Sequence, residues 1–208
     1  MAQDLRSYLD LVKRRKPGDF EIVSKPVDPR YEITALVVKL EREAKRRPVL
    51  LFENVTGSRF PVLTNLHASR PRLAAAMNAA PEATQTTYLH AMDKPIPPKV
   101  VAGGPVQEVV LEGDRVNLYD LPQIVHHQGD AGAYITAAIS FAKDPTKDIW
   151  NCAYNRLQIK SRNTTSIHLT TGKHLWEYQR LAEAKNEPLR LALVIGVHPA
   201  IALGALAI

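Results

Sequence analysis

The sequence predicts an α+β protein, with an N-terminal α/β domain followed by a domain that consists mainly of strands. Apolar residues recur at helical spacing through about the first 85 residues, with short continuous apolar runs between them. Prolines and paired glycines gather between residues 95 and 105, a composition typical of an extended linker. Strand-like segments separated by turns follow. We expect an N-terminal domain at 1–95, a linker at 96–105 and a second domain at 106–208.

The expected elements of the first domain alternate between helix and strand. In chain order they are a helix from Leu5 that ends at Lys16-Pro17-Gly18, a strand at 20–23, a helix from Ile33 to Lys45-Arg46-Arg47, a buried strand at 49–52, and a helix from Ser69 to Met77. Ser69 is the expected N-cap of the last helix, with Pro71 in its first turn. A turn is expected around Gly57.

The second domain is expected to contain strands at 106–112, 133–142, 152–160 and 165–169, then a helix at about 173–185. The apolar run 191–197 suggests a strand that is covered on both faces. Residues 198–208 begin like a helix and finish without a cap or a polar tail. We therefore expect a sequence that has been cut or has lost its remainder.

Net charge raises the question of nucleic-acid binding, because the chain carries 27 Lys and Arg against 21 Asp and Glu. The basic residues gather in two short clusters, Lys13 to Lys16 and Lys45 to Arg47, each expected to close a helix. Positive charge in a last helical turn complements the helix dipole without any ligand. No RNA-binding motif, zinc spacing or helix-turn-helix pattern accompanies the clusters, so nucleic acid is not an expected partner.

The sequence also argues against a membrane or secreted protein. No stretch approaches the roughly 20 apolar residues of a membrane span, and the first residues lack an apolar signal region. The single cysteine, Cys152, excludes an internal disulfide and fits a reducing compartment, so we expect a cytoplasmic protein. Cys152 is either a reactive thiol or, more often for a lone cysteine, a small buried apolar residue.

Three polar residues of the second domain have the chemistry of a cofactor site. An amide oxygen such as that of Asn151 can ligate a hard cation, and the guanidinium of Arg156 can bind a carboxylate or phosphate. His174 falls in the first turn of a predicted helix, where free backbone N–H groups favour phosphate. Asn151, His174 and a phosphate could share Mn²⁺ or Mg²⁺, with the imidazole favouring Mn²⁺.

Spacing alone leaves a simpler interpretation open. An Asn within a strand is usually an edge or turn residue, and a His at a helix start is usually solvated. Asn151 and Arg156 are five residues apart, so on a regular strand they point to opposite faces unless a bulge intervenes.

The order of several short elements resembles the UbiD family of decarboxylases over essentially the whole chain. These elements are Leu121-Pro122 to Thr136, Lys143-Asp144-Pro145, Asn151-x-x-x-x-Arg156, Gly172 to Trp176, and Gly196-x-His-Pro199. The resemblance implies a flavin-reductase-like split β-barrel that binds prenylated FMN, with the phosphate held through Mn²⁺ or Mg²⁺, often with K⁺ beside it. It also implies reversible, non-oxidative decarboxylation of an unsaturated or aromatic carboxylic acid.

The same resemblance assigns site residues. Asn151 and His174 match two metal ligands, and His174 fits better than His168 because of its spacing from Asn151. Arg156 matches the catalytic Arg that lies near the flavin and the substrate carboxylate. The residues expected along the cofactor are Tyr134, Ile135, Thr136, Trp150, Asn151, Ala153, Tyr154, Asn155, Arg156, Lys173 and His174.

Important parts of the family pattern have no counterpart in the 208 residues. The third metal ligand, a Glu, two further acids and a C-terminal domain would follow the Gly-x-x-Pro element. We therefore expect the isolated chain to be inactive and to need its C-terminal half or a complementary subunit, and we expect a homo-oligomer when it is complete. The alternative is a non-catalytic flavin-binding or interaction subunit of a split enzyme.

Overall fold

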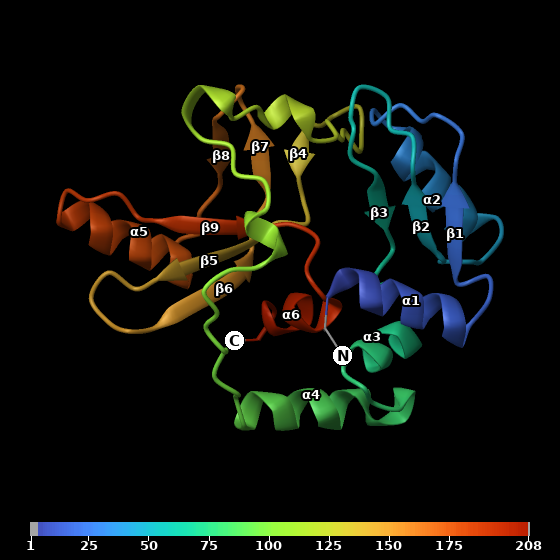
Figure 1. Cartoon of the computed structure of the whole chain (residues 1–208), viewed down its shortest axis with the longest axis horizontal. Coiled ribbons are helices and arrows are strands. Elements are labelled where there is room, and N and C mark those ends of the chain that lie inside the picture. Colours follow the sequence, from blue (N-terminus) through green and yellow to red (C-terminus); the bar gives the residue numbers. More distant parts are fainter. Residues whose placement is uncertain (1–3, 208) are drawn as a thin grey trace.

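The computed structural model describes residues 4–207; the outermost parts of the predicted domains, residues 1–3 and 208, lie outside the described residues. The fold is α+β, as predicted, with α1 to α3 around one sheet and α5 and α6 beside two others (Figure 1). The α-helices are α1 (Leu5–Arg15), α2 (Glu32–Arg42), α3 (Arg70–Ala76), α4 (Thr84–Asp93), α5 (His174–Ala184) and α6 (Pro199–Gly204). Short 3₁₀ turns lie at Pro81–Ala83, Pro105–Gln107, Gly113–Arg115 and Leu118–Asp120.

The strands form three separate three-stranded sheets in the described chain. The strands are β1 (Phe20–Val23), β2 (Val49–Phe52), β3 (Val62–Thr64), β4 (Tyr134–Ile135), β5 (Ile139–Lys143), β6 (Trp150–Tyr154), β7 (Leu157–Ile159), β8 (Thr165–Ile167) and β9 (Leu191–Val194). Their orders are β1-β2-β3, β4-β7-β8 and β6-β5-β9. Only the pair β1 and β2 is parallel.

The first sheet is covered on both faces, because the side chains of β2 alternate between two apolar clusters. Leu50 and Phe52 pack with Ile33 of α2 on one face. Val49 packs on the other face with Tyr8 and Val12 of α1 and with alanines of α3. Helix α1 begins with a capping box between Asp4 and Ser7 and has its basic residues in the last turn, as expected.

A buried arginine of α3 holds this unit together. Arg72 is 3% exposed, and its Nη1 lies 2.8 Å from Asp19 Oδ2 as an ion pair. Its Nη2 donates to the carbonyls of Arg47 (2.8 Å) and Asn65 (2.9 Å), while the Tyr8 hydroxyl donates to the Arg72 carbonyl. The Arg72 side chain therefore connects three segments of the chain: the residue before β1, the loop before β2 and the residue after β3.

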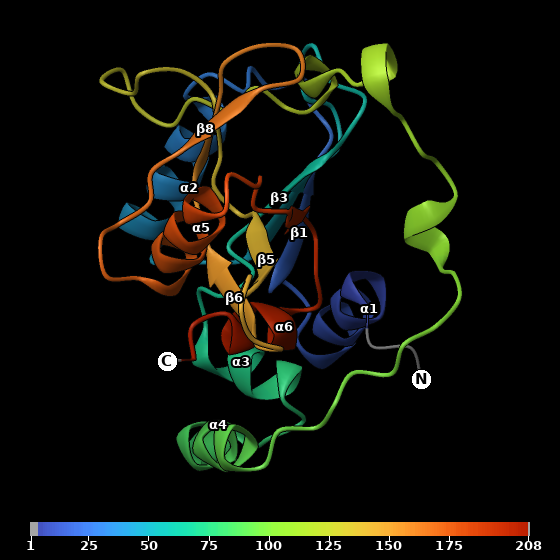
Figure 2. The same ribbon diagram turned by 90° about the vertical axis from the view of Figure 1, so that its left-hand side faces the viewer.

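Two secondary-structure predictions are wrong: one helix ends earlier than expected, and one expected strand is absent. Helix α2 ends at Arg42, and Lys45 to Arg47 lie beyond it, where Arg46 pairs with Glu21 and Arg47 with Glu41. The strand predicted at 106–112 is absent: the segment starts with a 3₁₀ turn, and every residue from 91 to 115 is exposed (Figure 2). Three valines and a leucine favoured a strand there, but no strand of the described chain pairs with this segment.

The predicted strands at 133–142 and 152–160 are each broken in two. Ile135 pairs with Leu157 and Ile139 with Tyr154, so residues 136–138 on one side stand opposite residues 155–156 on the other. One extra residue on one side is the definition of a bulge, which bends both strands into separate sheets. The prediction of one continuous strand failed because apolar patterning continues across the bend.

The run 191–197 is also less enclosed than predicted. Its strand, β9, ends at Val194 and lies at the edge of its sheet, beside β5 only. Leu193 is 40% exposed and Ile195 is 52% exposed. The sequence did not predict β3 or α4. Strand β3 is only three residues long, and helix α4 is weakly amphipathic.

Helix α6 joins the two halves of the described chain. Its N-cap His198 accepts a hydrogen bond from Ala200 N at Nδ1 (3.2 Å), and its ring packs edge-on against Tyr8 at 5.5 Å. Gly196 has φ +79°, and a Cβ there would lie 3.6 Å from Leu5 of α1. Gly196-x-His-Pro199 therefore forms a turn that packs against α1 and leads into α6.

Replacing Arg72 with Met is expected to lower the free energy of unfolding by about 3 kcal/mol or more, because Asp19 and several carbonyls lose their buried partner. Urea unfolding followed by circular dichroism measures the change. The exposed neighbour Arg70 is the matched control, and Arg70→Met should change stability by less than about 0.5 kcal/mol. An Arg72→Met protein as stable as the control would contradict the role assigned to Arg72.

His198 is expected to make stability depend on pH. Burial lowers its pKa below the ordinary value of 6.5, so the folded state favours the neutral ring. This contribution is present above pH 6.5 and is lost as pH falls through the folded pKa. His198→Asn, which keeps an acceptor for Ala200 N, should reduce the loss of stability between about pH 7 and pH 5. His90→Asn, at an exposed histidine of α4, should leave that loss unchanged.

Candidate functional site

The structure brings Asn151 and His174 together, although they are far apart in sequence. Asn151 lies on β6 opposite Ala142 of β5, and Ala142 packs against Leu175 and Tyr178 of α5. The Asn151 side chain therefore shares a sheet face with α5, whose first residue is His174. His174 Nδ1 lies 3.3 Å from Asn151 Oδ1.

The first turn of α5 supports this pair. The ring of His174 stacks on Tyr178 one turn later, with ring centroids 6.4 Å apart and planes at 19°. Tyr178 is buried, so it limits the orientations of the imidazole. The N-cap residue Lys173 makes no side-chain cap hydrogen bond, and it is exposed. The first backbone N–H groups of the helix are thus available to an anion such as a phosphate.

The separation of the two donor atoms fits a shared cation. Two ligands at right angles on an octahedral cation, with bonds of about 2.1 Å, stand about 3.0 Å apart. The observed 3.3 Å requires only a small adjustment. Between residues 4 and 207, no group of three or more His, Cys, Asp or Glu side chains could hold a metal ion. Asn151 and His174 would therefore supply two positions of a coordination sphere that other donors complete.

Arg156 lies at the bulge between the two sheets of the second half. It follows β6, precedes β7 and is exposed, and it has no hydrogen-bond or ion-pair partner among the described residues. An arginine without a counter-charge at a bend of the sheet is available to bind a carboxylate. Asn151 and Arg156 are five residues apart, at most about 16 Å along extended chain.

The neighbouring Asn155 stabilises this bend. Its Nδ2 donates to Ser140 Oγ (2.6 Å), and Ser140, which is fully buried, donates to the carbonyl of Ala153 (3.0 Å). The backbone N–H of Asn155 also donates to the Ala138 carbonyl. Ser140 was not predicted as a site residue; its only signal is a hydroxyl within the apolar strand Ile139–Lys143. Tyr178 was missed for a similar reason, since an aromatic residue on a helix usually indicates core.

The other predicted cofactor residues lie on different faces of β6 and in the adjoining sheet. Ala153 shares the face of Asn151, whereas Cys152 and Tyr154 point to the opposite face and pack near Ala202 of α6. Trp150 is 63% exposed at the start of β6. Tyr134 and Ile135 form β4 in the adjoining sheet, and Thr136 is exposed at the bulge.

Cys152 has the surroundings of a packing residue. It contacts the apolar cluster of Ile139 and Ala202, and burial raises the pKa of its thiol. A raised pKa disfavours the nucleophilic thiolate, so the structure favours a packing role for Cys152, although the residue is half-buried and not fully buried.

Two family models together match almost the whole chain. Residues 11–92 match the N-terminal domain of 3-octaprenyl-4-hydroxybenzoate carboxy-lyase, and residues 99–208 match its Rift-related domain. Both models carry the name UbiD. No helix within residues 4–207 has both the length and the apolar character needed to cross a membrane.

Solved structures of UbiD-class enzymes are similar along nearly the full chain. HmfF from Pelotomaculum thermopropionicum, in complex with FMN, is 38% identical with a TM-score of 0.89; the match covers 97% of this chain and 44% of HmfF. Vanillic acid decarboxylase from Sedimentibacter hydroxybenzoicus, in its closed form, is 28% identical with a TM-score of 0.86 over 97% of this chain and 44% of the enzyme.

A curated relative is the anhydromevalonate phosphate decarboxylase of Methanothermobacter thermautotrophicus, 28% identical over 94% of this chain and 43% of the relative. The chain spans less than half the length of the curated relatives that it matches.

Proposed function

Because the chain belongs to the UbiD family of carboxy-lyases, we propose that it forms the cofactor-binding part of a decarboxylase that uses prenylated FMN. The reaction is the reversible, non-oxidative decarboxylation of an unsaturated or aromatic carboxylic acid. The observation that carries the proposal is the approach of Asn151 Oδ1 and His174 Nδ1 to 3.3 Å beside the open N-terminus of α5. An evolved dimeric form of HmfF, 38% identical to this chain, has been solved in complex with prFMN.

The flavin phosphate is the group that suits the start of α5. Asn151 and His174 would hold Mn²⁺ or Mg²⁺, the backbone N–H groups of the first turn of α5 would donate to phosphate oxygens, and Lys173 would add positive charge. We infer that strands β4 to β9 are part of the split β-barrel of flavin reductases, with the cofactor lying along β6 from Asn151 toward Arg156.

Arg156 is the catalytic residue that this part of the protein supplies. Its guanidinium binds the substrate carboxylate through two parallel hydrogen bonds and orients the bond to be broken. Prenylated FMN, when bound, takes up the electron pair left by departing CO₂. The bulge positions Arg156 at the bend, and the Asn155–Ser140 hydrogen bond keeps the bend rigid.

Protonation of the product carbon needs a general acid that the described residues do not place beside Arg156. No Asp or Glu among residues 4–207 forms an ion pair with Arg156. Further chain, a complementary subunit or a second copy would supply the acid and the third metal ligand. The exposed apolar edge of β9 is a suitable surface for such an association.

The second candidate function is a non-catalytic flavin-binding or interaction subunit of a split enzyme. The same absence of an acidic partner for Arg156 in the described chain favours it. Vanillic acid decarboxylase, at 28% identity, includes a separate component named ShVdcD in one solved form. Flavin retention without turnover, even in the presence of the complementary half, would favour this candidate over the enzyme.

Replacing Asn151 with Ala is expected to raise the dissociation constant for Mn²⁺ by about tenfold or more, because one protein ligand is lost. The loss of the free Mn²⁺ signal in electron paramagnetic resonance measures binding, and retained flavin is measured by absorbance. His174→Ala should behave in the same way. Asn163→Ala, in the turn between β7 and β8, is the control. Equal Mn²⁺ affinity in Asn151→Ala and Asn163→Ala would refute the assigned ligand.

A polypeptide of residues 1–208 alone is expected to release no CO₂, even with prenylated FMN and Mn²⁺ supplied. The physical reason is that it offers two protein ligands and no acid at Arg156. The assay measures CO₂ from a panel of cinnamic- and benzoic-type acids against a flavin-free control. Turnover above this control would show that further acids are dispensable.

A further inference from the structure

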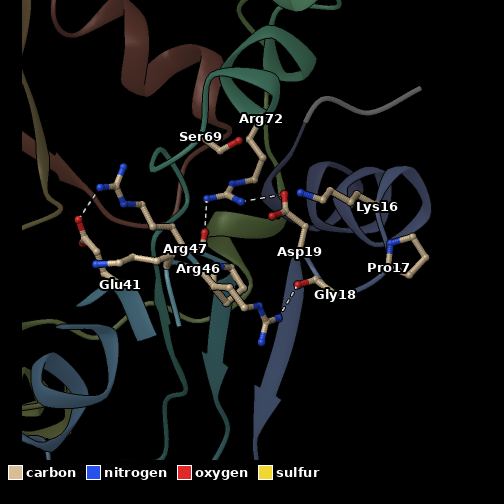
Figure 3. A pocket seen from close by; sticks show the side chains of 11 residues that line it. Lys16, Pro17, Gly18, Asp19, Glu41, Arg46, Arg47, Ser69 and Arg72 are labelled. Atoms are coloured by element: carbon tan, nitrogen blue, oxygen red, sulfur yellow. Dashed lines mark hydrogen bonds and ion pairs between the residues drawn. The ribbon is translucent and has the colours of Figure 1, made fainter. Parts of the chain in front are cut away.

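A polar cavity lies away from the candidate decarboxylase site. It is a cleft of about 650 Å³ at the amino ends of β1 and β2, bounded by the segments 16–19 and 45–48 and by the start of α3 (Figure 3). None of the predicted cofactor residues lines it. Its cationic side chains come from both basic clusters of the sequence, which the fold brings around one opening: Lys16, Lys45, Arg46, Arg47 and, from α3, Arg72.

The charges around this cleft do not balance. Three carboxylates, those of Asp19, Glu21 and Glu41, pair with Arg72, Arg46 and Arg47 respectively. The remaining cations, Lys16 and Lys45, have no hydrogen-bond or ion-pair partner among residues 4–207. Two positive charges are therefore left without a counter-charge in a concave site, where an anion is favoured.

Further donors face the same opening. The hydroxyl of Ser69 makes no hydrogen bond in the described structure, not even as a helix cap. The side chains of Arg46 and Arg47 each use only Nη2 in hydrogen bonds among the described residues, so their other guanidinium N–H groups are free. In Figure 3 the Ser69 hydroxyl lies beside Arg72, and the Lys16 side chain extends toward Asp19. Planar guanidinium groups, ammonium groups and a hydroxyl are the donors that phosphate oxygens accept from.

The walls of the cleft are held by the fold. Arg72 binds Asp19 of one wall and the Arg47 carbonyl of the other, and it is itself buried. Arg46 also donates to the Gly18 carbonyl (3.1 Å) across the opening. A site fixed in this way loses little entropy when a ligand binds.

We propose that this cleft binds a small molecule that carries phosphate groups. Its volume falls within the range of about 300–1,000 Å³ for small-molecule sites. Nucleic acid fits less well, because the unpaired cations gather around one enclosed opening rather than along a surface that a backbone could follow. The proposal is independent of the decarboxylase site, since no residue is shared between them.

Isothermal titration calorimetry with inorganic pyrophosphate, at an ionic strength of about 0.15 M, tests the proposal. The variant is Lys16→Gln with Lys45→Gln, which removes both unpaired charges and keeps side-chain length. Both lysines are exposed and without partners, so the variant should stay folded, which circular dichroism checks. We expect about tenfold or greater weakening of pyrophosphate binding.

The matched control is Lys94→Gln with Lys99→Gln, two exposed lysines outside the cleft that lower the net charge equally. It should bind pyrophosphate as the unaltered protein does. No measurable binding, equal weakening in the two double variants, or equally tight binding of sulfate would each overturn the proposal. An oligonucleotide that displaces pyrophosphate and depends on the same two lysines would replace it with a nucleic-acid surface.

Discussion

Burial of the Arg72 guanidinium is the constraint on which the N-terminal half depends. A buried charge is costly unless it is paired and hydrogen-bonded, so the chain must bring one carboxylate and several carbonyls to a single point. Meeting that requirement sets where β1 and β2 begin and where β3 ends. The Tyr8 hydroxyl, bound to the Arg72 carbonyl, extends the constraint to α1, and the Tyr8 ring contacts His198.

The same arginine contributes to two different properties of the molecule. It joins the core of the first sheet to the loops before β1 and β2, and those loops carry the cations of the phosphate cleft. Helix dipoles account for the basic residues within α1, but Lys45 to Arg47 lie beyond the end of α2. Arg46 and Arg47 are held there by the carboxylates of Glu21 and Glu41 and, for Arg46, by the Gly18 carbonyl across the opening.

In the second half the corresponding constraint is the bulge at residues 136–138 and 155–156. It divides two long antiparallel strands into two sheets and leaves Arg156 at the bend without a partner. Asn155 donates to Ser140 there, and Ser140 donates to the Ala153 carbonyl, so partly buried hydrogen bonds stabilise the bend. The strand β6 then connects the metal-ligand pair at one end to the arginine at the other.

The sequence by itself determined the local elements whose signals are short-range. The amphipathic helix α1, the apolar strand β2, the start of α3 at Ser69–Pro71 and helix α5 follow from residue spacing and from residue preferences at helix ends, although the Ser69 side chain makes no capping hydrogen bond. The order of motifs also identified the family and named Asn151, Arg156 and His174. Only the tertiary structure decided which of these approach one another. The 3.3 Å contact of Asn151 with His174 depends on the packing of α5 against Ala142, and the bulge depends on pairing between strands. The buried Arg72 and the cleft beside it likewise join residues from separate segments, because charges are compensated through space and not along the chain.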